Sequence, residues 1–294
     1  MMRILLTGGS GQVGSALAHL ASQDLVFITP HRDELDLSIA ESIKIYLARE
    51  KFAAIINCAA YTAVDKAESE TDLAWHINAT APGLIAEHCA KAKIPLLHVS
   101  TDYVFSGQAH SPYVEEDDVG PINVYGASKE AGEAAIRVVT DAHIILRTSW
   151  VVSAIGNNFI KTMLRLGADS DELRVVADQH GSPTSAQDIA QILRMLVFQA
   201  IEGQENFGTF HFTSSGDTNW AEFARTIFEF SQQRGGPFAR VTSIMTAEYP
   251  TPAKRPHNSR LDTRKIEATY GITPRPWKEA VSDILSMLIP KRAS

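Results

Sequence analysis

The sequence has little of what would place the protein outside the cell or in a membrane. It contains only two cysteines, Cys58 and Cys89, and both lie in apolar patterns, so we expect buried thiols and no disulfide framework. The apolar run at residues 1–7 is too short for a signal peptide, and no later run approaches the length of a membrane span. The expected location is the cytoplasm, without a membrane partner.

An excess of basic residues is also absent. Lys and Arg number 27 against 34 Asp and Glu, which gives a formal net charge of -7, and no basic run is interleaved with aromatic residues. This balance argues against a nucleic-acid partner. The sequence has no repeat or low-complexity segment, so its 294 residues can form one large domain or two smaller ones. It leaves open whether the chain forms a homodimer.

Three glycines follow the first apolar run. Gly8, Gly11 and Gly14 have the spacing Gly-x-x-Gly-x-x-Gly between an expected strand and an amphipathic pattern. Glycines at these positions let the backbone turn tightly and approach a pyrophosphate, which the N–H groups of the following helix would bind. We therefore predict a dinucleotide-binding site at Gly8, Gly11 and Gly14.

Strand-like runs and helical patterns alternate through the first half of the chain. Strands are expected at residues 3–7, 25–28, 53–58 and 95–99, with helices at 38–51 and 72–93. This alternation predicts an α/β fold with a Rossmann-type, doubly wound parallel sheet over residues 1–150.

The alternation becomes less regular over residues 151–294, which are expected to form a smaller C-terminal substrate-binding lobe with some elements returning to the sheet. Expected there are helices at 158–166, 187–201, 220–230 and 277–289, strands at 173–177 and 209–213, and a proline-containing loop at 249–258.

The end of the second expected strand lacks an acid. An NAD-selective site often places an acid there to bind the ribose hydroxyls, but residues 29–32 read Thr-Pro-His-Arg. Arg32 could accommodate a 2'-phosphate, which favours NADPH over NADH as the cofactor. A solvated loop arginine without a partner is the competing interpretation.

A phenol and an amine lie four residues apart where a helix is expected to begin. Tyr125 and Lys129 would then share one helix face. The ammonium is expected to lower the pKa of the phenol from its usual value of about 10, which would make Tyr125 a proton donor for a carbonyl under reduction. Thr101 follows the fourth expected strand, where ligands bind in open parallel sheets, and its hydroxyl could hold that carbonyl. Taken singly, a solvated helix face and a local turn would explain these residues.

The triplet Thr101, Tyr125 and Lys129, together with the glycine spacing, resembles the extended short-chain dehydrogenase/reductases. Longer strings are similar to the dTDP-4-dehydrorhamnose reductase family and cover nearly the whole chain, at residues 57–68, 100–107, 125–133, 147–150, 181–184 and 255–262. The resemblance implies NAD(P)H-dependent reduction of the C4 ketone of dTDP-6-deoxy-L-lyxo-4-hexulose to dTDP-L-rhamnose, the last step of dTDP-rhamnose formation. Residues 151–294 would mainly bind the sugar nucleotide.

The resemblance also implies roles for single residues. Tyr125 would donate the proton, Lys129 would perturb its pKa and hold the nicotinamide ribose, and Thr101 would bond the carbonyl. Further cofactor contacts would come from Gln12, Val13, Asp36, Leu37, Ala60, Tyr61 and Thr62, and further substrate contacts from Asp102 and Trp150. Some family members bind magnesium through a glutamate shortly after the glycines, where this chain has Ala16 and no acid, so no metal is expected.

Three other functions stay open from the sequence. The first is a sugar-nucleotide epimerase or dehydratase that keeps its cofactor bound, although Tyr103 stands where related dehydratases carry a carboxylate base. The second is a non-catalytic NADP-binding regulatory subunit like that of methionine adenosyltransferase, although the intact triplet argues against it. The third is a reductase for another nucleotide-linked sugar.

Overall fold

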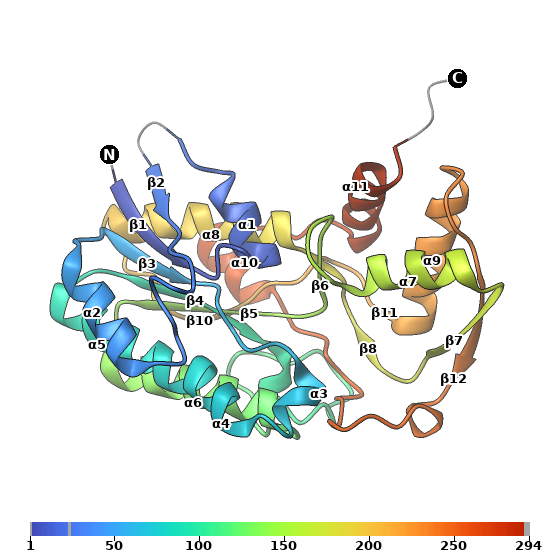
Figure 1. The fold of residues 1–294 in the computed structure, drawn as a ribbon, viewed down its shortest axis with the longest axis horizontal. Coiled ribbons are helices and arrows are strands. Elements are labelled where there is room, and N and C mark those ends of the chain that lie inside the picture. The colour runs from blue at the N-terminus through green and yellow to red at the C-terminus, as the bar shows by residue number, and fades with distance from the viewer. Residues whose placement is uncertain (1, 23–24, 291–294) are drawn as a thin grey trace.

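The computed structural model describes residues 2–22 and 25–290, and in this part of the chain six strands form one parallel sheet (Figure 1). The strands are β1 (Met2–Thr7), β2 (Leu25–Ile28), β3 (Ala54–Asn57), β4 (Leu96–Thr101), β5 (His143–Thr148) and β10 (Gly208–His211). Their order is β10-β5-β4-β3-β1-β2, and all these pairings are parallel. The direction of winding reverses next to β1, so the predicted Rossmann-type, doubly wound fold is confirmed. Met1 and residues 291–294, which belong to the predicted N-terminal run and C-terminal lobe, lie outside the described residues.

Helices cover both faces of this sheet (Figure 1). One face carries α1 (Gln12–Ala18), α8 (Ala186–Ile201) and α10 (Arg264–Tyr270), and the other carries α2 (Ala40–Arg49), α5 (Ala81–Ala92) and α6 (Val124–Val139). Side chains along β1 alternate between the two cores: Ile4 and Leu6 lie in the first, and Leu5 lies in the second. Burial on both faces explains why the strands read as continuous apolar runs.

A second group of elements has its own apolar core, at the right of Figure 1. It is formed by α7 (Phe159–Asp169), α9 (Trp220–Gln232), α11 (Trp277–Leu288), and β7 (Glu172–Val176) paired in parallel with β12 (Arg240–Ile244). Two short pairs connect it to the sheet: β6 (Val151–Val152) with β9 (Thr184–Ser185), and β8 (His180–Gly181) with β11 (Thr218–Asn219). A 3-10 turn, η3 (Thr246–Glu248), precedes the expected loop at residues 249–258. The elements α8, β10 and α10 return to the sheet.

The prediction of one continuous helix at residues 72–93 is wrong in one respect. It is divided into α4 (Thr71–Trp75), a π-helical turn η1 (His76–Thr80) and α5, preceded by the short α3 (Val64–Ala67). Pro82 has no N–H to give to the carbonyl of Asn78 four residues earlier, so regular α-helical hydrogen bonding cannot continue through this point. The π turn is the local solution.

The strands β5 and β12 and the helix α10 were not predicted from the sequence pattern. The run at residues 143–148 contains Arg147, whose charge hides the strand from a search for apolar runs, although Arg147 is only 3% exposed. None of the helices in the described ranges has the length and apolar character that a membrane span requires.

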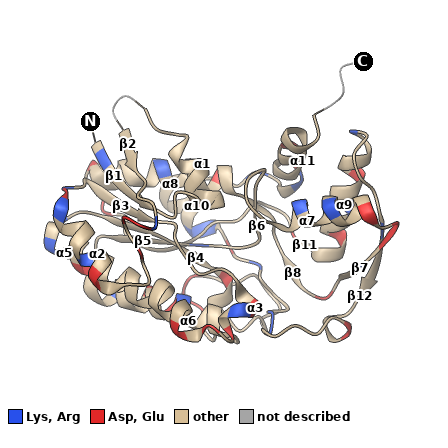
Figure 2. Cartoon of the chain, viewed as in Figure 1, with Lys and Arg blue, Asp and Glu red and all other residues tan. Residues whose placement is uncertain are grey.

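Acidic and basic residues are interspersed over both halves of the fold (Figure 2), but one ion pair is fully buried. Glu133 on α6 is inaccessible to solvent and accepts hydrogen bonds from Arg147 on β5, at 2.7 Å from Nη2 and 3.0 Å from Nε. Arg137, at the edge of this pair, donates a further hydrogen bond to Glu133 at 2.8 Å. Burial acts to raise the pKa of Glu133, but the bonds and charge of Arg147 outweigh it and lower that pKa. The pair fastens α6 to the sheet.

Replacing Glu133→Ala is expected to lower the free energy of unfolding by about 3–5 kcal/mol, because it leaves the Arg147 guanidinium buried without a counter-ion. Urea denaturation at neutral pH measures this. The control is Glu130→Ala, which removes the ion pair that Glu130 forms with Arg137 at 2.8 Å. Because the Arg137 side chain is 35% exposed, this change should lower the free energy of unfolding by less than about 1 kcal/mol. Equal losses in the two variants would contradict the importance given to the buried pair.

Candidate active site

The carboxyl ends of four neighbouring strands meet at one edge of the sheet. Because the strands are parallel and in register, Thr7 at the end of β1 pairs with Asn57 on β3, and Thr101 at the end of β4 pairs with Thr148 on β5. Ligands of doubly wound sheets bind outside this edge. The predicted glycine turn and the predicted Thr101 therefore belong to the same side of the molecule.

The glycine turn is closely packed against the next strand. Gly8 has a φ of +72°, and a Cβ built there would lie 2.6 Å from the backbone nitrogen of Ala59. A Cβ on Gly14 would lie 2.1 Å from the carbonyl oxygen of Gly8. Only glycine fits at these two positions. Helix α1 begins directly after Gly11, and no side chain caps its first N–H groups.

The side chains of Gln12 and Val13 make contacts within the protein. The Oε1 atom of Gln12 accepts hydrogen bonds from Ser153 at 3.1 Å and from Asn158 at 2.9 Å, which connects the glycine turn to the second half of the chain. The side chain of Val13 lies in the core of the sheet. Backbone N–H groups are therefore what these two residues can offer to a phosphate.

Arg32, Asp36 and Leu37 lie together after β2. The Nε atom of Arg32 is 3.2 Å from Oδ2 of Asp36, and the arginine side chain is 72% exposed. Ser38 donates two hydrogen bonds to Oδ1 of Asp36, at 2.8 and 2.6 Å. Leu37 is half-buried beside them. Arg32 thus has an acidic partner, contrary to the alternative of a loop arginine without one, and a 2'-phosphate would compete with Asp36 for its guanidinium.

A buried asparagine holds the loop with Ala60, Tyr61 and Thr62. Asn78, in the π turn, accepts a hydrogen bond from the N–H of Tyr61 at 2.8 Å and donates to its carbonyl at 3.1 Å. It also donates to the hydroxyl of Ser128 on α6 at 3.0 Å. Asn78 has no expected role from the sequence, where the signal for it is a polar residue four positions before Pro82 inside a helical pattern.

Thr101 and Tyr125 are brought together by two caps. Thr101 ends β4 and caps the 3-10 turn η2 (Asp102–Val104), accepting a hydrogen bond from the N–H of Tyr103 at 3.2 Å. Asn123 caps α6 by accepting from the N–H of Gly126 at 2.8 Å, which puts Tyr125 in the first helical turn. The hydroxyl of Thr101 lies beside the phenol of Tyr125 and acts to lower the pKa of that phenol.

The expected lowering of the phenol pKa by Lys129 is wrong for this arrangement. Burial raises the pKa of Tyr125 to about 12, the nearby Thr101 hydroxyl acts in the opposite direction, and the charge of Asp102 raises the pKa further. The amine of Lys129 lies 3.0 Å from Nε2 of His98 and donates to the carbonyl of Val99 at 2.8 Å. Burial lowers the pKa of Lys129 itself to about 8.

His98 and Asn57 were missed because each stands in an apolar run and was assigned to a strand without a role. Arg255, in the expected loop at residues 249–258, forms an ion pair with Asp65 at 2.7 Å.

Trp150 follows β5 and has a strained backbone. Its φ of +47° is unusual for a residue with a side chain. Its indole stacks on Trp220 with ring centres 3.6 Å apart, and its carbonyl accepts a hydrogen bond from the N–H of Thr184 at 3.1 Å. The aromatic pair therefore lies where the chain passes from the sheet into the second core.

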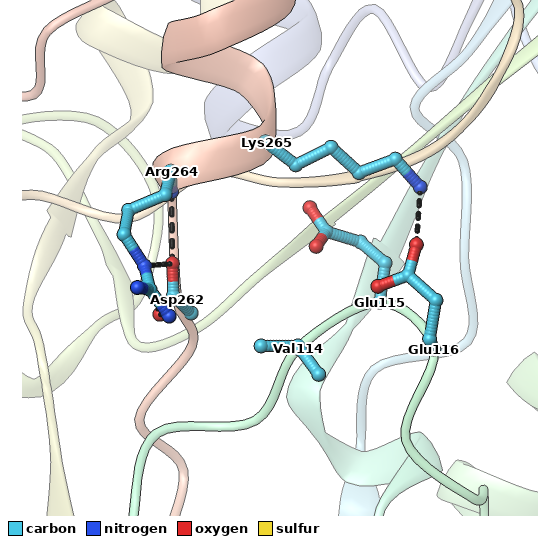
Figure 3. Close-up of a pocket in the computed structure, with 6 residues that line it drawn as sticks. All are labelled: Val114, Glu115, Glu116, Asp262, Arg264 and Lys265. Atoms are coloured by element: carbon cyan, nitrogen blue, oxygen red, sulfur yellow. Dashed lines mark hydrogen bonds and ion pairs between the residues drawn. The ribbon is translucent and has the colours of Figure 1, made fainter.

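A surface pocket elsewhere contains none of the predicted site residues. Its lining comprises Val114, Glu115, Glu116, Asp262, Arg264 and Lys265 (Figure 3). Lys265 bonds Glu116 at 2.9 Å and Arg264 bonds Asp262 at 2.8 Å, so most of its charges are paired. Residues 2–22 and 25–290 hold no cluster of three or more His, Cys, Asp or Glu side chains suited to a metal ion.

Known proteins are similar to this chain over nearly its whole length. The family model described as "RmlD substrate binding domain" matches residues 2–289. A dTDP-4-dehydrorhamnose reductase of Sinorhizobium fredii is 42% identical over 290 residues, which cover 98% of each chain. The chain belongs to the dTDP-4-dehydrorhamnose reductase family. The predicted family is confirmed, and the names of these relatives support the reductase, not the regulatory subunit.

Solved structures of dTDP-4-dehydrorhamnose reductases have the same fold as this chain. The enzyme of Clostridium acetobutylicum has a TM-score of 0.91 and 38% identity, with 98% of this chain and 99% of that chain covered. The enzyme of Bacillus anthracis, solved in complex with NADP, has a TM-score of 0.91 and 33% identity, with 98% and 100% covered.

Asp102 is the most perturbed carboxyl of the site in this reductase-family chain. It is 3% exposed, its Oδ1 accepts a hydrogen bond from Thr101 at 3.0 Å, and its Oδ2 has no hydrogen-bond partner. Burial raises the pKa of Asp102 to about 7, against the nearby hydroxyls of Ser259 and Thr101, which act to lower that pKa.

Replacing Asp102→Asn is expected to stabilise the protein at pH 8 but not at pH 4. A carboxyl whose pKa is raised in the fold makes the native state lose stability as pH rises from about 4 to about 7, by up to about 4 kcal/mol, and the loss persists above that range. Melting temperatures of both proteins across this range measure the effect. The exposed Asp118→Asn should show no such pH dependence, and a gain for Asp102→Asn that is equal at both pH values would contradict the raised pKa.

Proposed function

We propose that this chain reduces the C4 ketone of dTDP-6-deoxy-L-lyxo-4-hexulose to dTDP-L-rhamnose with NADPH, and accepts NADH as a second donor. The observation that carries the proposal is the contact of Thr101 with Tyr125 at the carboxyl edge of the sheet, in a chain whose full-length relatives are named for this reaction. The relative from Bacillus anthracis was solved with NADP.

The residues at the sheet edge fit a dinucleotide. The cradle at Gly8 and Gly14, where a Cβ would collide with backbone, and the uncapped start of α1 suit a pyrophosphate. Arg32, Asp36 and Leu37 would hold the adenosine end, and Ala60, Tyr61, Thr62 and Lys129 the nicotinamide end. When bound, the reduced nicotinamide would supply the hydride.

The chain itself would supply hydrogen bonds and a proton. Reduction of a ketone leaves negative charge on the oxygen, so the site needs donors where that charge develops. The Thr101 hydroxyl would donate one hydrogen bond, and Tyr125 would give the proton. Because burial raises the pKa of Tyr125 to about 12, the phenol is protonated at neutral pH, which is the form that a proton donor requires.

We further propose that the two halves of the chain bind different ligands. Residues 1–150 would bind the cofactor, and residues 151–294 would mainly bind the sugar nucleotide, with Asp102 and Trp150 at the boundary. The stack of Trp150 on Trp220 supports this, since it offers an apolar wall beside the strand ends. The two cysteines are free thiols, which supports a reducing compartment such as the cytoplasm. For assembly, a homodimer is the proposal to test by light scattering.

The function is tested with dTDP-4-keto-6-deoxy sugar generated in place by the preceding enzymes. We expect one NADPH oxidised for each keto sugar reduced, a smaller kcat/KM with the UDP- and GDP-linked sugars, and release of the cofactor on dialysis. Tightly held NAD with isomerised or dehydrated sugar and no net cofactor oxidation would assign the chain to the epimerases or dehydratases.

Replacing Tyr125→Phe is expected to lower kcat by about 10²- to 10⁴-fold, because the proton donor is removed while the ring packing is kept. Lys129→Met should lower kcat by orders of magnitude as well. Unfolding curves check that both variants stay folded. Tyr46→Phe, on α2 and remote from the strand ends, is the matched control and should keep full activity. A Tyr125→Phe protein with near-native turnover would exclude Tyr125 as the proton donor.

A further inference from the structure

The side chain of Gln12 joins the glycine turn to the segment that connects β6 with α7, where the sheet meets the second core (Figure 1). Its Oε1 atom accepts a hydrogen bond from Nδ2 of Asn158 at 2.9 Å, and its Nε2 atom donates to the carbonyl of Val151 at 3.4 Å. Gly156, with a φ of +73°, turns the segment over this side chain, and a Cβ there would lie 3.3 Å from Cγ of Gln12. The first residue of α1 therefore contacts both ends of the connecting segment.

The orientation of the two side-chain amides is fixed from one end. Asn158 caps α7, and the backbone N–H of Lys161 can only donate, so the atom of Asn158 that faces it at 3.3 Å is Oδ1. The Nδ2 atom of Asn158 then donates one hydrogen to Gln12 and the other to the carbonyl of Ser153 at 2.7 Å. Gln12 must present its oxygen to Asn158, which leaves its Nε2 for the carbonyl of Val151.

Aromatic contacts lead from the cap of α7 to Trp150. Phe159, the first residue of α7, packs on Trp220 with ring centres 4.6 Å apart, and Trp220 stacks on Trp150 with ring centres 3.6 Å apart. On the other side, Trp150 directly precedes Val151, whose carbonyl faces Gln12. The contacts therefore close into a ring, and Gln12 reaches Trp150 from two directions.

Trp150 is a residue that needs such support. Its backbone φ of +47° is a strained conformation, which persists only where the surrounding contacts hold it. Its indole also packs closely on Gly181, because a Cβ on that glycine would lie 2.7 Å from Cε2 of the ring. The orientation of the indole thus depends on the contacts around it.

We propose that Gln12 and Asn158 are positioning residues that couple the cofactor site to Trp150. The inference rests on the proposed function, in which N–H groups at the start of α1 bind the cofactor pyrophosphate and Trp150 contacts the sugar nucleotide. A bound pyrophosphate restrains the backbone of Gln12. The side chain of the same residue then restrains the cap of α7 and the carbonyl next to Trp150. Cofactor binding strengthens the binding of the sugar nucleotide in this way, and by linkage the reverse also holds.

Other connections between the two cores begin elsewhere. Arg275 bonds Asp188 on α8 at 2.8 Å and Asp283 on α11 at 2.6 Å. The strand pairs β6 with β9 and β8 with β11 are backbone connections. These contacts hold the two halves together whether or not a cofactor is bound. The bonds of Gln12 differ because they start at the turn that would hold the cofactor.

Hydrogen exchange followed by mass spectrometry tests the coupling, with NADP as the probe and without substrate. In wild type, we expect NADP to slow exchange at residues 8–18, around the glycine turn, and at residues 151–163, which include the connecting segment and the first turn of α7. In Asn158→Ser, the hydroxyl still caps α7, but the bond to Gln12 is missing. NADP should then slow exchange at residues 8–18 and no longer at residues 151–163.

The matched control is Asn219→Ser. Asn219 caps α9 in the same core by accepting from the N–H of Glu222 at 2.9 Å, so the same substitution is made at a helix cap that faces away from the coupling. This variant should keep the effect of NADP on residues 151–163. A weaker cap alone would speed exchange equally with and without NADP. If Asn158→Ser does not fold, Gln12→Met gives the second measurement, because it removes the same bond and keeps the backbone N–H.

A double variant and turnover measurements add two readouts. Gln12→Met combined with Asn158→Ser should lose no more of the NADP effect than either single variant, because both remove one bond. The Kd of NADP for substrate-free Asn158→Ser should stay within about 2-fold of wild type, whereas the KM for the keto sugar at saturating NADPH should rise by about 5-fold or more. The kcat should stay within about 3-fold, since the lost contact positions the substrate and takes no part in the chemistry.

Protection of residues 151–163 by NADP that persists in Asn158→Ser, or that is lost equally in Asn219→Ser, would overturn the proposal. So would an absence of this protection in wild type. An absence of protection at residues 8–18 would overturn the proposed cofactor site together with the coupling. Failure of the keto sugar to react would leave the exchange results unchanged, so the coupling and the proposed reaction fail separately.

Discussion

The placement of α6 depends on the buried ion pair between Glu133 and Arg147, and the proposed catalytic arrangement depends on α6. Removing two charges from water is costly, and mutual attraction compensates only when the geometry is close and the remaining hydrogen bonds are made. Arg147 bonds Glu133 through two nitrogens, and Arg137 bonds it from the surface. Glu133 is one turn after Lys129 and two turns after Tyr125, so a helix fixed here against β5 also fixes the phenol against Thr101.

The site is built from two layers of polar residues. The outer layer, with Thr101, Asp102 and Tyr125, would meet the substrate and keeps hydrogen-bonding capacity free, as the unpartnered Oδ2 of Asp102 illustrates. The inner layer, with Asn57, Asn78 and His98, is buried and its members hydrogen-bond the chain. The outer layer can therefore respond to what binds, while the inner layer holds the loops and Lys129 at fixed positions.

The sequence predicted those features that depend on local rules. The glycine turn follows from backbone sterics at Gly8 and Gly14, and the first turn of α6 follows from the spacing of Tyr125 and Lys129. Features that depend on contacts between residues far apart in the chain could not be predicted from local sequence patterns. The strand with Arg147 is hidden until Glu133 is known to lie beside it, and the high pKa of Tyr125 reflects burial, which no local pattern reports. Resemblance to a family gave the residue roles that the spacing alone left open.

The return of β10 to the sheet has a consequence for how the chain folds as it is made. Residues 208–211 pair with residues 144–147 and form one edge of the sheet, and Phe210 lies in the core next to α8. Until these residues have left the ribosome, β5 has an open edge and part of the core has no cover. The N-terminal 150 residues therefore cannot complete their sheet until residues 208–211 in the second half of the chain have been made.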